Sequence, residues 1–319
     1  MFRVHVPRAT CLAWVTSRRD RSTCLAPDTV LLGHGRPPGR PQARVAVGLD
    51  SPRVSVYADL FRYRELFANL FRRDLTAKYK GSVLGVAWSL ANPLLLMAIY
   101  MLVFSVLWKV VDDIDHYPLF LLAGLAVWVF LSTSLSAAAR SMLDSAELIR
   151  KVRFPRQLVT FSVVATQLVA FGAMLLVLVV VSLIVLPRTR DTVWLAPPLA
   201  LLVVALVSGL ALAVAAANVV FRDVEHLVTA LLLPWFFLTP ILYSIAALPG
   251  GLDRHRTLKE LLRWGNPITP PIEALRAPLY LGELPRLADV AYLAVAAAAA
   301  LALGAFVFGR VDDRIAVEL

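Results

Sequence analysis

Residues 174–186 read MLLVLVVVSLIVL, and twelve of these thirteen side chains are apolar. At roughly −0.4 kcal/mol for each apolar residue near the helix centre, a helix through this stretch gains about 5 kcal/mol on entering a bilayer. The longer run 158–186 also exceeds the ~20 residues that a helix needs to cross the hydrocarbon core. The stretch therefore predicts a transmembrane helix and, with it, a membrane protein.

The composition of the whole chain of 319 residues agrees with that prediction. Hydrophobic residues make up 59% of it and charged residues 17%, against about 45–50% and about 25% in a typical soluble domain. These values exclude a water-soluble enzyme, a disordered chain and a disulfide scaffold. The two cysteines, Cys11 and Cys24, are too few for a disulfide framework, and they form no CxxC motif.

Six apolar stretches reach the length of a membrane span. They are residues 83–108, 118–139, 158–186, 194–221, 227–248 and 287–309. We therefore expect an all-α integral membrane protein with six transmembrane helices, contained in a transmembrane domain over 57–319. Residues 1–56 are expected to be a disordered tail, because Pro, Gly and Arg dominate the run GHGRPPGRPQAR at 33–44.

An amphipathic helix is expected at 59–80, just before the first span. Its apolar residues recur at spacings of three and four, opposite a face rich in cations, and Asp59 is a candidate N-cap. Arg64 and Asp74 interrupt the apolar pattern. A basic amphipathic helix of this kind lies along a membrane surface, although a solvated helix packed on the protein is the alternative.

Two short outer helices are expected between spans five and six. Leu258, Leu261, Leu262 and Trp264 form one helical face, and the breaker Gly265-Asn266-Pro267 follows it. A second short helix is predicted from Pro271 to about Tyr280.

The distribution of cations predicts how the spans are oriented. With both termini in the cytoplasm, 23 of the 32 Lys and Arg residues lie in inner segments and 9 in outer ones, as the positive-inside rule requires. Residues 1–82 hold 15 of them, and the loop 140–157 holds five more. The net charge of +10 points to anionic headgroups or an acidic partner. Nucleic acid is a poor partner for a chain that lies mostly in lipid.

Motifs for catalysis are absent from the sequence. None of the five lysines follows a glycine, so the GxxxxGK[ST] phosphate-binding loop is missing. GxSxG and HExxH are missing too, and the five histidines lie too far apart in the sequence for a metal site. The acidic run Asp112, Asp113 and Asp115 is a candidate Mg²⁺ site for a diphosphate, with a solvated acidic loop as the alternative.

Aromatic residues punctuate the first and fifth spans. The candidates for contact with a sliding sugar chain are Trp88, Tyr100, Phe104, Trp235, Phe236 and Tyr243. Lipid-facing anchors at the membrane interface are the alternative. Pro93 in the first span, and Pro234 and Pro240 in the fifth, kink or open these helices and favour a cavity between them. Kinks in lipid-facing helices are the alternative.

The segment RSMLDSAELIRKVRFPR at 140–156 predicts a short charged helix between spans two and three, which Pro155 ends. A soluble partner that binds such a helix could displace it. An ordinary charged loop is the alternative.

Three segments of the chain resemble one family of transport proteins. They are LFRRDLTAKYKGSVLGVAWSLANPLLLMAIYMLVFSVLW at 70–108, NVVFRDVEHLVTALLLPWFFLTPILY at 218–243, and the segment from Asn266-Pro267 to Arg276. The first contains the turn Lys78-x-Lys80-Gly81-Ser82 and the stretch Trp88-Ser89-x-x-Asn92-Pro93. Over about 57–315 the chain is similar to the permease subunits of ABC exporters for polysaccharides. These are the O-antigen, teichoic acid and galactan exporters of the type-2 ABC exporter superfamily.

The resemblance implies a transport mechanism with no catalytic residue, no metal and no cofactor in this chain. Two permease copies, expected to be a homodimer, would form a channel for a lipid-linked glycan. Two copies of a separate ABC ATPase subunit would drive it and would hold ATP and Mg²⁺. The protein would be a multi-pass protein of the bacterial inner membrane with both termini cytoplasmic.

The resemblance also implies roles for particular residues. The coupling helix that contacts the ATPase would lie at 140–155, with the contact residues Asp144, Glu147, Leu148, Arg150, Lys151, Arg153, Phe154 and Pro155. The lipid diphosphate headgroup would pair with the cations Arg72, Arg73, Lys78 and Lys80. The six aromatic candidates above would line the channel, and the two short outer helices would form its exit gate.

Other functions remain open on the sequence alone. The same fold is compatible with a permease for a drug or a small lipid. A membrane enzyme acting on polyprenyl diphosphates would use the acidic run at 112–115. A third possibility is a membrane anchor for a soluble complex, in which the segment 140–155 would matter and the aromatic residues would not.

Overall fold

The computed structural model describes residues 57–82, 85, 87–103, 115–152, 154–245 and 256–318. Within these ranges the regular elements are all helical. They are α1 (Ala58–Arg62), α2 (Arg64–Tyr79), α3 (Ala87–Met101), α4 (Tyr117–Asp144), α5 (Ala146–Lys151), α6 (Gln157–Val185), α7 (Ala196–Val220), α8 (Val224–Leu238), α9 (Arg256–Trp264), α10 (Thr269–Arg276) and α11 (Leu287–Glu318). Short turns of other helix types lie at Pro187–Thr189, Val193–Leu195 and Ala277–Leu281. The expected tail at 1–56 lies outside the described residues.

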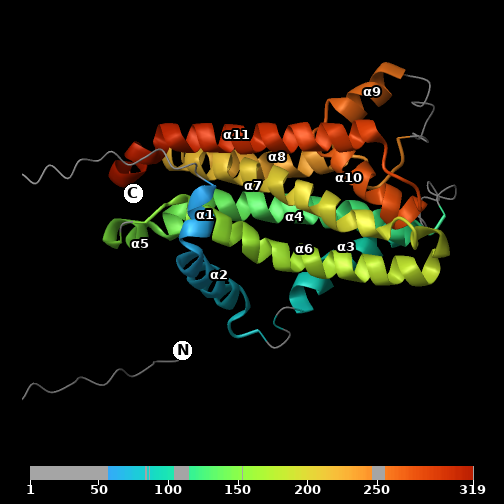
Figure 1. Ribbon diagram of the computed structural model, residues 1–319, viewed down its shortest axis with the longest axis horizontal. Coiled ribbons are helices and arrows are strands. Elements are labelled where there is room, and N and C mark those ends of the chain that lie inside the picture. The colour runs from blue at the N-terminus through green and yellow to red at the C-terminus, as the bar shows by residue number, and fades with distance from the viewer. Residues whose placement is uncertain are drawn as a thin grey trace, which may run out of the picture. The chain divides into compact units, whose positions relative to one another are not determined.

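Four helices are long and apolar enough to cross a membrane. They cover Tyr117–Asp144, Gln157–Val185, Val193–Val220 and Leu287–Asp312, and they run side by side in Figure 1 as α4, α6, α7 and α11. The prediction of an all-helical membrane protein is confirmed, and these four helices match four of the six predicted spans. The helices α3 and α8 are shorter than the ~20 residues of a span, so the count of six stays a prediction.

The fifth predicted span, 227–248, is wrong as a single helix because α8 ends at Leu238. Thr239 has an extended backbone, with φ −89° and ψ 133°. The residue before a proline avoids the helical region, since the proline ring clashes with its backbone, and Pro240 follows directly. Pro234, by contrast, is accommodated inside α8. The two prolines therefore differ in effect, and only the second stops the helix.

The helices α7 and α11 approach each other through small residues. A Cβ atom built on Gly209 would lie 2.3 Å from the backbone carbonyl carbon of Ala300, and one on Gly304 would lie 2.5 Å from the carbonyl oxygen of Gly209. Close backbone contact through small side chains is a common way for helices to associate in membranes, where apolar burial between helices gives little driving force. This pair of helices anchors one side of the bundle.

The predicted amphipathic helix at 59–80 is divided into α1 and α2. Tyr63 leaves the helical conformation with φ −108° and ψ 33°, and the sequence pattern does not predict that break. The expectation that Asp59 caps the helix is wrong, because Tyr57 occupies the N-cap. The Asp59 carboxylate instead accepts a hydrogen bond from Gln157 Nε2 on α6 at 2.7 Å. Asp74, which interrupts the apolar pattern, accepts one from Ser162 Oγ on the same helix at 2.6 Å.

The short helices lie at the two ends of the bundle (Figure 1). The elements α1, α2 and α5 lie near one end, called the α5 end below, and α9 and α10 lie near the other, called the α10 end. Among the described residues, α9 and α10 lie in the stretch between predicted spans five and six. The prediction that they are the two outer helices stays a prediction. Which end faces the cytoplasm stays a prediction.

Candidate functional site

An open cavity of about 810 Å³ lies between α2, α3, α4 and α6. Its volume falls in the range of about 300–1,000 Å³ that is usual for ligand sites. The lining mixes apolar groups with cations, carboxylates, hydroxyls and amides. Its charged residues are Arg73, Asp74, Lys78, Arg140 and Asp144. Because such groups are costly to leave facing hydrocarbon, a polar cavity within a membrane protein is a candidate functional site.

The helix α2 supplies two of the cations, and hydrogen bonds hold both in place. Lys78 Nζ donates to Gln167 Oε1 on α6 at 2.7 Å. Arg73 Nε donates to Asp74 Oδ1 at 2.9 Å, and its Nη2 donates to Ser145 Oγ at 3.2 Å. These contacts tie α2 to the rest of the bundle while both positive groups stay on the cavity wall.

The four predicted headgroup residues are therefore separated by the structure. Arg73 and Lys78 line the cavity, whereas Arg72 and Lys80 are exposed and are not part of its lining. Successive residues of an α-helix are about 100° apart around its axis, which turns Arg72 away from the face of Arg73. Lys80 lies beyond the end of α2, where the backbone is extended.

Arg140 is a cavity residue that sequence reasoning did not assign to the headgroup. The expectation placed it at the start of the segment 140–155, but α4 continues to Asp144 and includes it. Thr133, Ser136, Arg140 and Asp144 all line the cavity. Their spacings of three, four and four residues are those of one helical face, and this periodicity is the signal that could have found Arg140.

A buried amide joins three helices behind Arg140. Arg140 Nε lies 3.1 Å from Glu225 Oε1, at the start of α8. The side chain of Asn218 on α7 accepts a hydrogen bond from the Glu225 backbone N–H at 2.9 Å and donates to the Ala139 carbonyl at 2.7 Å. Asn218 is fully buried. The polar residue near the end of span four is thus satisfied by neighbouring helices, as a polar group in a membrane must be.

The turn between α2 and α3 brings a second set of residues to the cavity. Gly81 and Gly85 have positive φ angles of 77° and 51°, a region that glycine adopts without strain. Ser82 Oγ accepts a hydrogen bond from the Gly85 backbone N–H at 3.0 Å. Trp88 and Asn92 at the start of α3 join Lys78 in the cavity lining.

The predicted channel aromatics fall into separate groups. Trp88 lies in the cavity, 54% exposed. Tyr100 stacks on Phe236 with ring centroids 5.5 Å apart, and Trp128 on α4 contacts both Trp235 and Phe236 at 5.9 and 5.5 Å. Trp128 and Phe236 are buried in this single chain. Sequence reasoning missed Trp128 because it lies in span two.

The structure says less about the remaining two aromatic candidates. The Tyr243 hydroxyl contacts the carbonyls of Phe237 and Leu238 at 3.5 and 3.4 Å, near the end of α8. Phe104 lies outside the described residues. A channel lined by the six aromatics stays a prediction.

The predicted ATPase-coupling residues surround α5, which is shorter than the segment 140–155. Asp144 is the last residue of α4, and Arg153 lies outside the described residues. On α5 the apolar Ile149 is buried, while Glu147 and Lys151 form an exposed ion pair at 3.1 Å. Exposed Arg150 and half-buried Leu148, Phe154 and Pro155 complete the set. This charged tip is available at the end of the bundle, but its role as a coupling helix stays a prediction.

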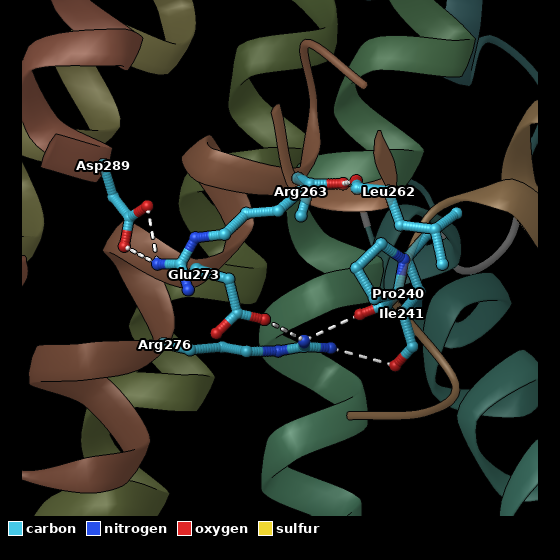
Figure 2. A network of polar contacts seen from close by, with 8 residues as sticks. Pro240, Ile241, Leu262, Arg263, Glu273, Arg276 and Asp289 are labelled. Atoms are coloured by element: carbon cyan, nitrogen blue, oxygen red, sulfur yellow. Dashed lines mark hydrogen bonds and ion pairs between the residues drawn. The ribbon is translucent and has the colours of Figure 1, made fainter. Parts of the chain in front are cut away.

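A buried arginine, Arg276, makes several polar contacts at the α10 end (Figure 2). Arg276 is 1% exposed, and its two terminal nitrogens donate to the carbonyls of Pro240 and Ile241 at 2.7 and 2.9 Å. It also pairs with Glu273 at 3.0 Å, and its guanidinium carbon lies 3.6 Å from the ring centroid of Phe120. Burial lowers the pKa of Arg276, and the Glu273 carboxylate opposes that shift. Arg276 thus binds two carbonyls of the segment that follows α8.

A second polar group also holds the end of α8. Asn266 Oδ1 accepts a hydrogen bond from Trp235 Nε1 at 3.0 Å, and Asn266 Nδ2 donates to Thr239 Oγ1 at 2.8 Å. Nearby, Arg263 Nη2 donates to both carboxylate oxygens of Asp289, at 2.9 and 2.8 Å, and so joins α9 to α11. The segment between α9 and α10 is therefore bound to one of the predicted channel aromatics.

The acidic run at 112–115 is described only at Asp115, whose backbone carbonyl accepts a hydrogen bond from the Tyr280 hydroxyl. Among the described residues, no group of three or more His, Cys, Asp or Glu side chains is arranged to hold a metal ion.

Comparison with known proteins agrees with these features. The ABC-2 type transporter family matches residues 65–280. An O-antigen export system permease protein RfbA of Myxococcus xanthus is 34% identical over 232 residues, which cover 73% of this chain and 86% of that protein. Two proteins of the same description from Klebsiella pneumoniae are 32% and 31% identical over 186 residues, or 58% of this chain and 71% of each relative. The chain, a multi-pass membrane protein, belongs to the ABC-2 type transporter family.

Proposed function

We propose that this chain is the transmembrane permease subunit of an ATP-driven ABC exporter. Its cargo would be a lipid-linked polysaccharide of the O-antigen, galactan or teichoic acid type, moved across the bacterial inner membrane. The similarity to O-antigen export permeases supports this class of cargo. The observation that carries the proposal is the cation-lined cavity beside α2, because it offers an anionic lipid headgroup a polar site within the membrane protein.

In this proposal Arg73, Lys78 and Arg140 bind the diphosphate of the lipid carrier. Cations form short, charge-assisted hydrogen bonds to phosphate oxygens, and the present partners of these three side chains are a carboxylate, an amide or a hydroxyl. Exchange of such partners for a phosphate costs little at a solvated site. Arg72 and Lys80, exposed nearby, would attract the headgroup before it enters.

The energy would come from a separate ABC ATPase, of which two copies bind ATP and Mg²⁺. The sequence lacks the phosphate-binding loop, so this chain would not hold the nucleotide in that way. The charged tip around α5 would seat in the ATPase, and its displacement would shift the bundle between two states. A second permease copy, as a homodimer, would complete the channel. Both termini would then be cytoplasmic, with the α5 end facing inward.

The glycan path would run from the cavity toward the α10 end. The helices α3 and α8 would line it with Tyr100 and Trp235, and α9 and α10 would form the outer gate. Membership of a transporter family argues against the alternative of an enzyme acting on polyprenyl diphosphates.

Co-purification tests the proposal directly. The tagged protein is extracted from native membranes in mild detergent, and its stoichiometric partners are identified. We expect an ABC ATPase, and we expect its loss in the double charge reversal Glu147→Lys with Arg150→Glu. The matched control is Arg190→Glu, an exposed cation at the α10 end, which should retain the ATPase. A monodisperse wild-type protein without an ATPase would contradict the exporter function.

A further inference from the structure

The proposed headgroup site uses only part of the cavity. The rest of the lining includes several neutral polar side chains, among apolar groups and the carboxylates of Asp74 and Asp144. Besides the cations, the lining contains Trp88 and Asn92 on α3, Thr133 and Ser136 on α4, and Gln167 on α6. None of these side chains carries a charge that a phosphate requires. They can therefore contact a neutral, polar part of a ligand.

The neutral residues lie beyond the cations along the same helix face. On α4, Thr133 precedes Arg140 by two helical turns, which places it about 10 Å farther along the helix axis and on the same side. On α3, Trp88 and Asn92 are four residues apart and so lie on one face. A ligand with its phosphates at Arg73 and Arg140 would extend past Thr133 toward the middle of the bundle.

The exposure of these residues shows that they are open to a ligand. Trp88 is 54% exposed, and Asn92 and Thr133 are both exposed although each belongs to an apolar helix. An amide facing lipid hydrocarbon would lose its hydrogen bonds at considerable cost. Because Asn92 and Thr133 face a cavity instead, a polar occupant stabilises them and an acyl chain does not.

An aromatic ring beside amide and hydroxyl groups suits a sugar. The flat ring of Trp88 offers an apolar surface with a polar edge, which matches the C–H face of a pyranose. Asn92 both donates and accepts, and Thr133 Oγ1, which donates to the Val129 carbonyl at 2.6 Å, keeps lone pairs free to accept. All three residues line the same cavity.

We propose that Trp88, Asn92 and Thr133 form a subsite for the sugar that is attached directly to the lipid diphosphate. The cavity then recognises the first sugar of the cargo as well as its charge. Specificity follows because a site built to hydrogen-bond a substrate hydroxyl discriminates against a ligand that lacks it. This inference rests on the proposed function and adds specificity to it.

Lipid binding to the full permease, purified with its ATPase into nanodiscs, tests the subsite. The probes are undecaprenyl diphosphate alone and undecaprenyl diphosphate bearing one glucose, galactose or N-acetylglucosamine. Wild-type protein should bind at least one glycosylated probe about tenfold more tightly than the bare lipid, as one or two good hydrogen bonds allow. Asn92→Leu should abolish that preference and leave the affinity for the bare lipid within about twofold.

Further variants separate the subsite from the headgroup site. Trp88→Leu should weaken binding of the glycosylated probe, Trp88→Phe should restore part of it, and Thr133→Val provides a near-isosteric variant if Trp88→Leu does not fold. The matched control is Trp194→Leu, because Trp194 is 65% exposed outside the cavity. Arg73→Gln should weaken all the diphosphate probes alike.

The outcomes distinguish the two proposals. Equal affinity of wild-type protein for bare and glycosylated lipids would overturn the subsite and leave the proposed exporter intact. Loss of preference in Trp194→Leu as large as in Asn92→Leu would overturn it too, because the effect would not then belong to the cavity. Failure of every diphosphate probe to bind would overturn the headgroup site and the subsite together.

Discussion

Arginines occupy both ends of the bundle, but in opposite surroundings. At the α5 end, the side chains of Arg73 and Arg140 are 46% and 62% exposed. At the α10 end, Arg276 is 1% exposed and contacts two carbonyls, a carboxylate and an aromatic ring. Exposed ion pairs contribute about 0–1 kcal/mol, whereas breaking a buried pair costs about 3–5 kcal/mol. The comparison teaches that desolvation decides which arginines are free to bind a ligand and which hold the fold.

The largest expected effect is at Arg276. The substitution Arg276→Met leaves the Glu273 carboxylate and the carbonyls of Pro240 and Ile241 without their donor. We expect a loss of about 3–5 kcal/mol in the free energy of unfolding, measured by denaturation in detergent. Arg190→Met, at an exposed position of the same end, is the control and should change stability little. Equal stability of Arg276→Met and wild type would show that the buried Arg276 does not hold the fold.

A smaller effect is expected at Gly124, which makes room for the same guanidinium. A Cβ atom on Gly124 would lie 2.7 Å from Arg276 Nη2 and 3.1 Å from Ile241 Cγ2. Gly124→Ala should therefore cost about 1–3 kcal/mol by overpacking. Combined with Arg276→Lys, which removes Nη2, the cost should be less than additive in a double-mutant cycle.

The matched control for Gly124 is Gly172→Ala on α6, where no atom lies within 4 Å of the added Cβ. That variant should be neutral or slightly more stable, because alanine is the better helix former. Strict additivity of Gly124→Ala and Arg276→Lys would show that the two positions do not share one steric contact.

The link between Asn266 and Trp235 should contribute less. Asn266→Ala leaves Trp235 Nε1 without its acceptor and removes the hydrogen bond that Thr239 Oγ1 accepts, at a cost of about 1–3 kcal/mol for an unsatisfied group. Asn266→Asp keeps an acceptor for the indole and should recover part of the loss. Thermal unfolding, with tryptophan fluorescence as the probe, measures both. Unchanged stability of Asn266→Ala would contradict the assigned hydrogen bonds.

The smallest effect on stability is expected at Arg140. Arg140→Gln loses a partly exposed ion pair with Glu225, so the free energy of unfolding should change by less than about 1 kcal/mol. Binding of undecaprenyl diphosphate should nevertheless weaken about tenfold, since a charge-assisted bond to phosphate is lost. A binding assay at low and high salt gives a second test. Salt screens charge interactions, so the difference in lipid affinity between wild type and Arg140→Gln should be smaller at high salt. Strong destabilisation of Arg140→Gln without a change in lipid binding would show that Arg140 holds the fold and does not bind the ligand.

Much of the architecture follows from local pattern. Four apolar runs predict α4, α6, α7 and α11 because a helix satisfies every backbone group within itself in lipid. The break at Gly265 to Pro267 is predicted by residues whose backbone preferences are local. These signals need no knowledge of neighbouring helices.

The errors arise where a distant partner decides the outcome. Asp59 is a residue type that commonly caps helices, but its carboxylate accepts a hydrogen bond from Gln157 on another helix. Trp88 and Tyr100 share one predicted span, yet one lines the cavity and the other packs on Phe236. Arg72 and Arg73 are identical by type, and only the rotation of α2 against α6 separates them. Sequence spacing predicts which residues share a helix face, but it does not predict what that face packs against.

The sequence alone thus determined that this protein is a helical membrane protein without a phosphate-binding loop, because hydrophobic length and missing motifs are local properties. The tertiary structure decided the rest of the site. It placed Arg140 with Arg73 and Lys78 around one cavity and buried Arg276 against Phe120 and Gly124. The physical reason is that desolvation depends on what surrounds a charge in space, and residues far apart in the chain provide those surroundings.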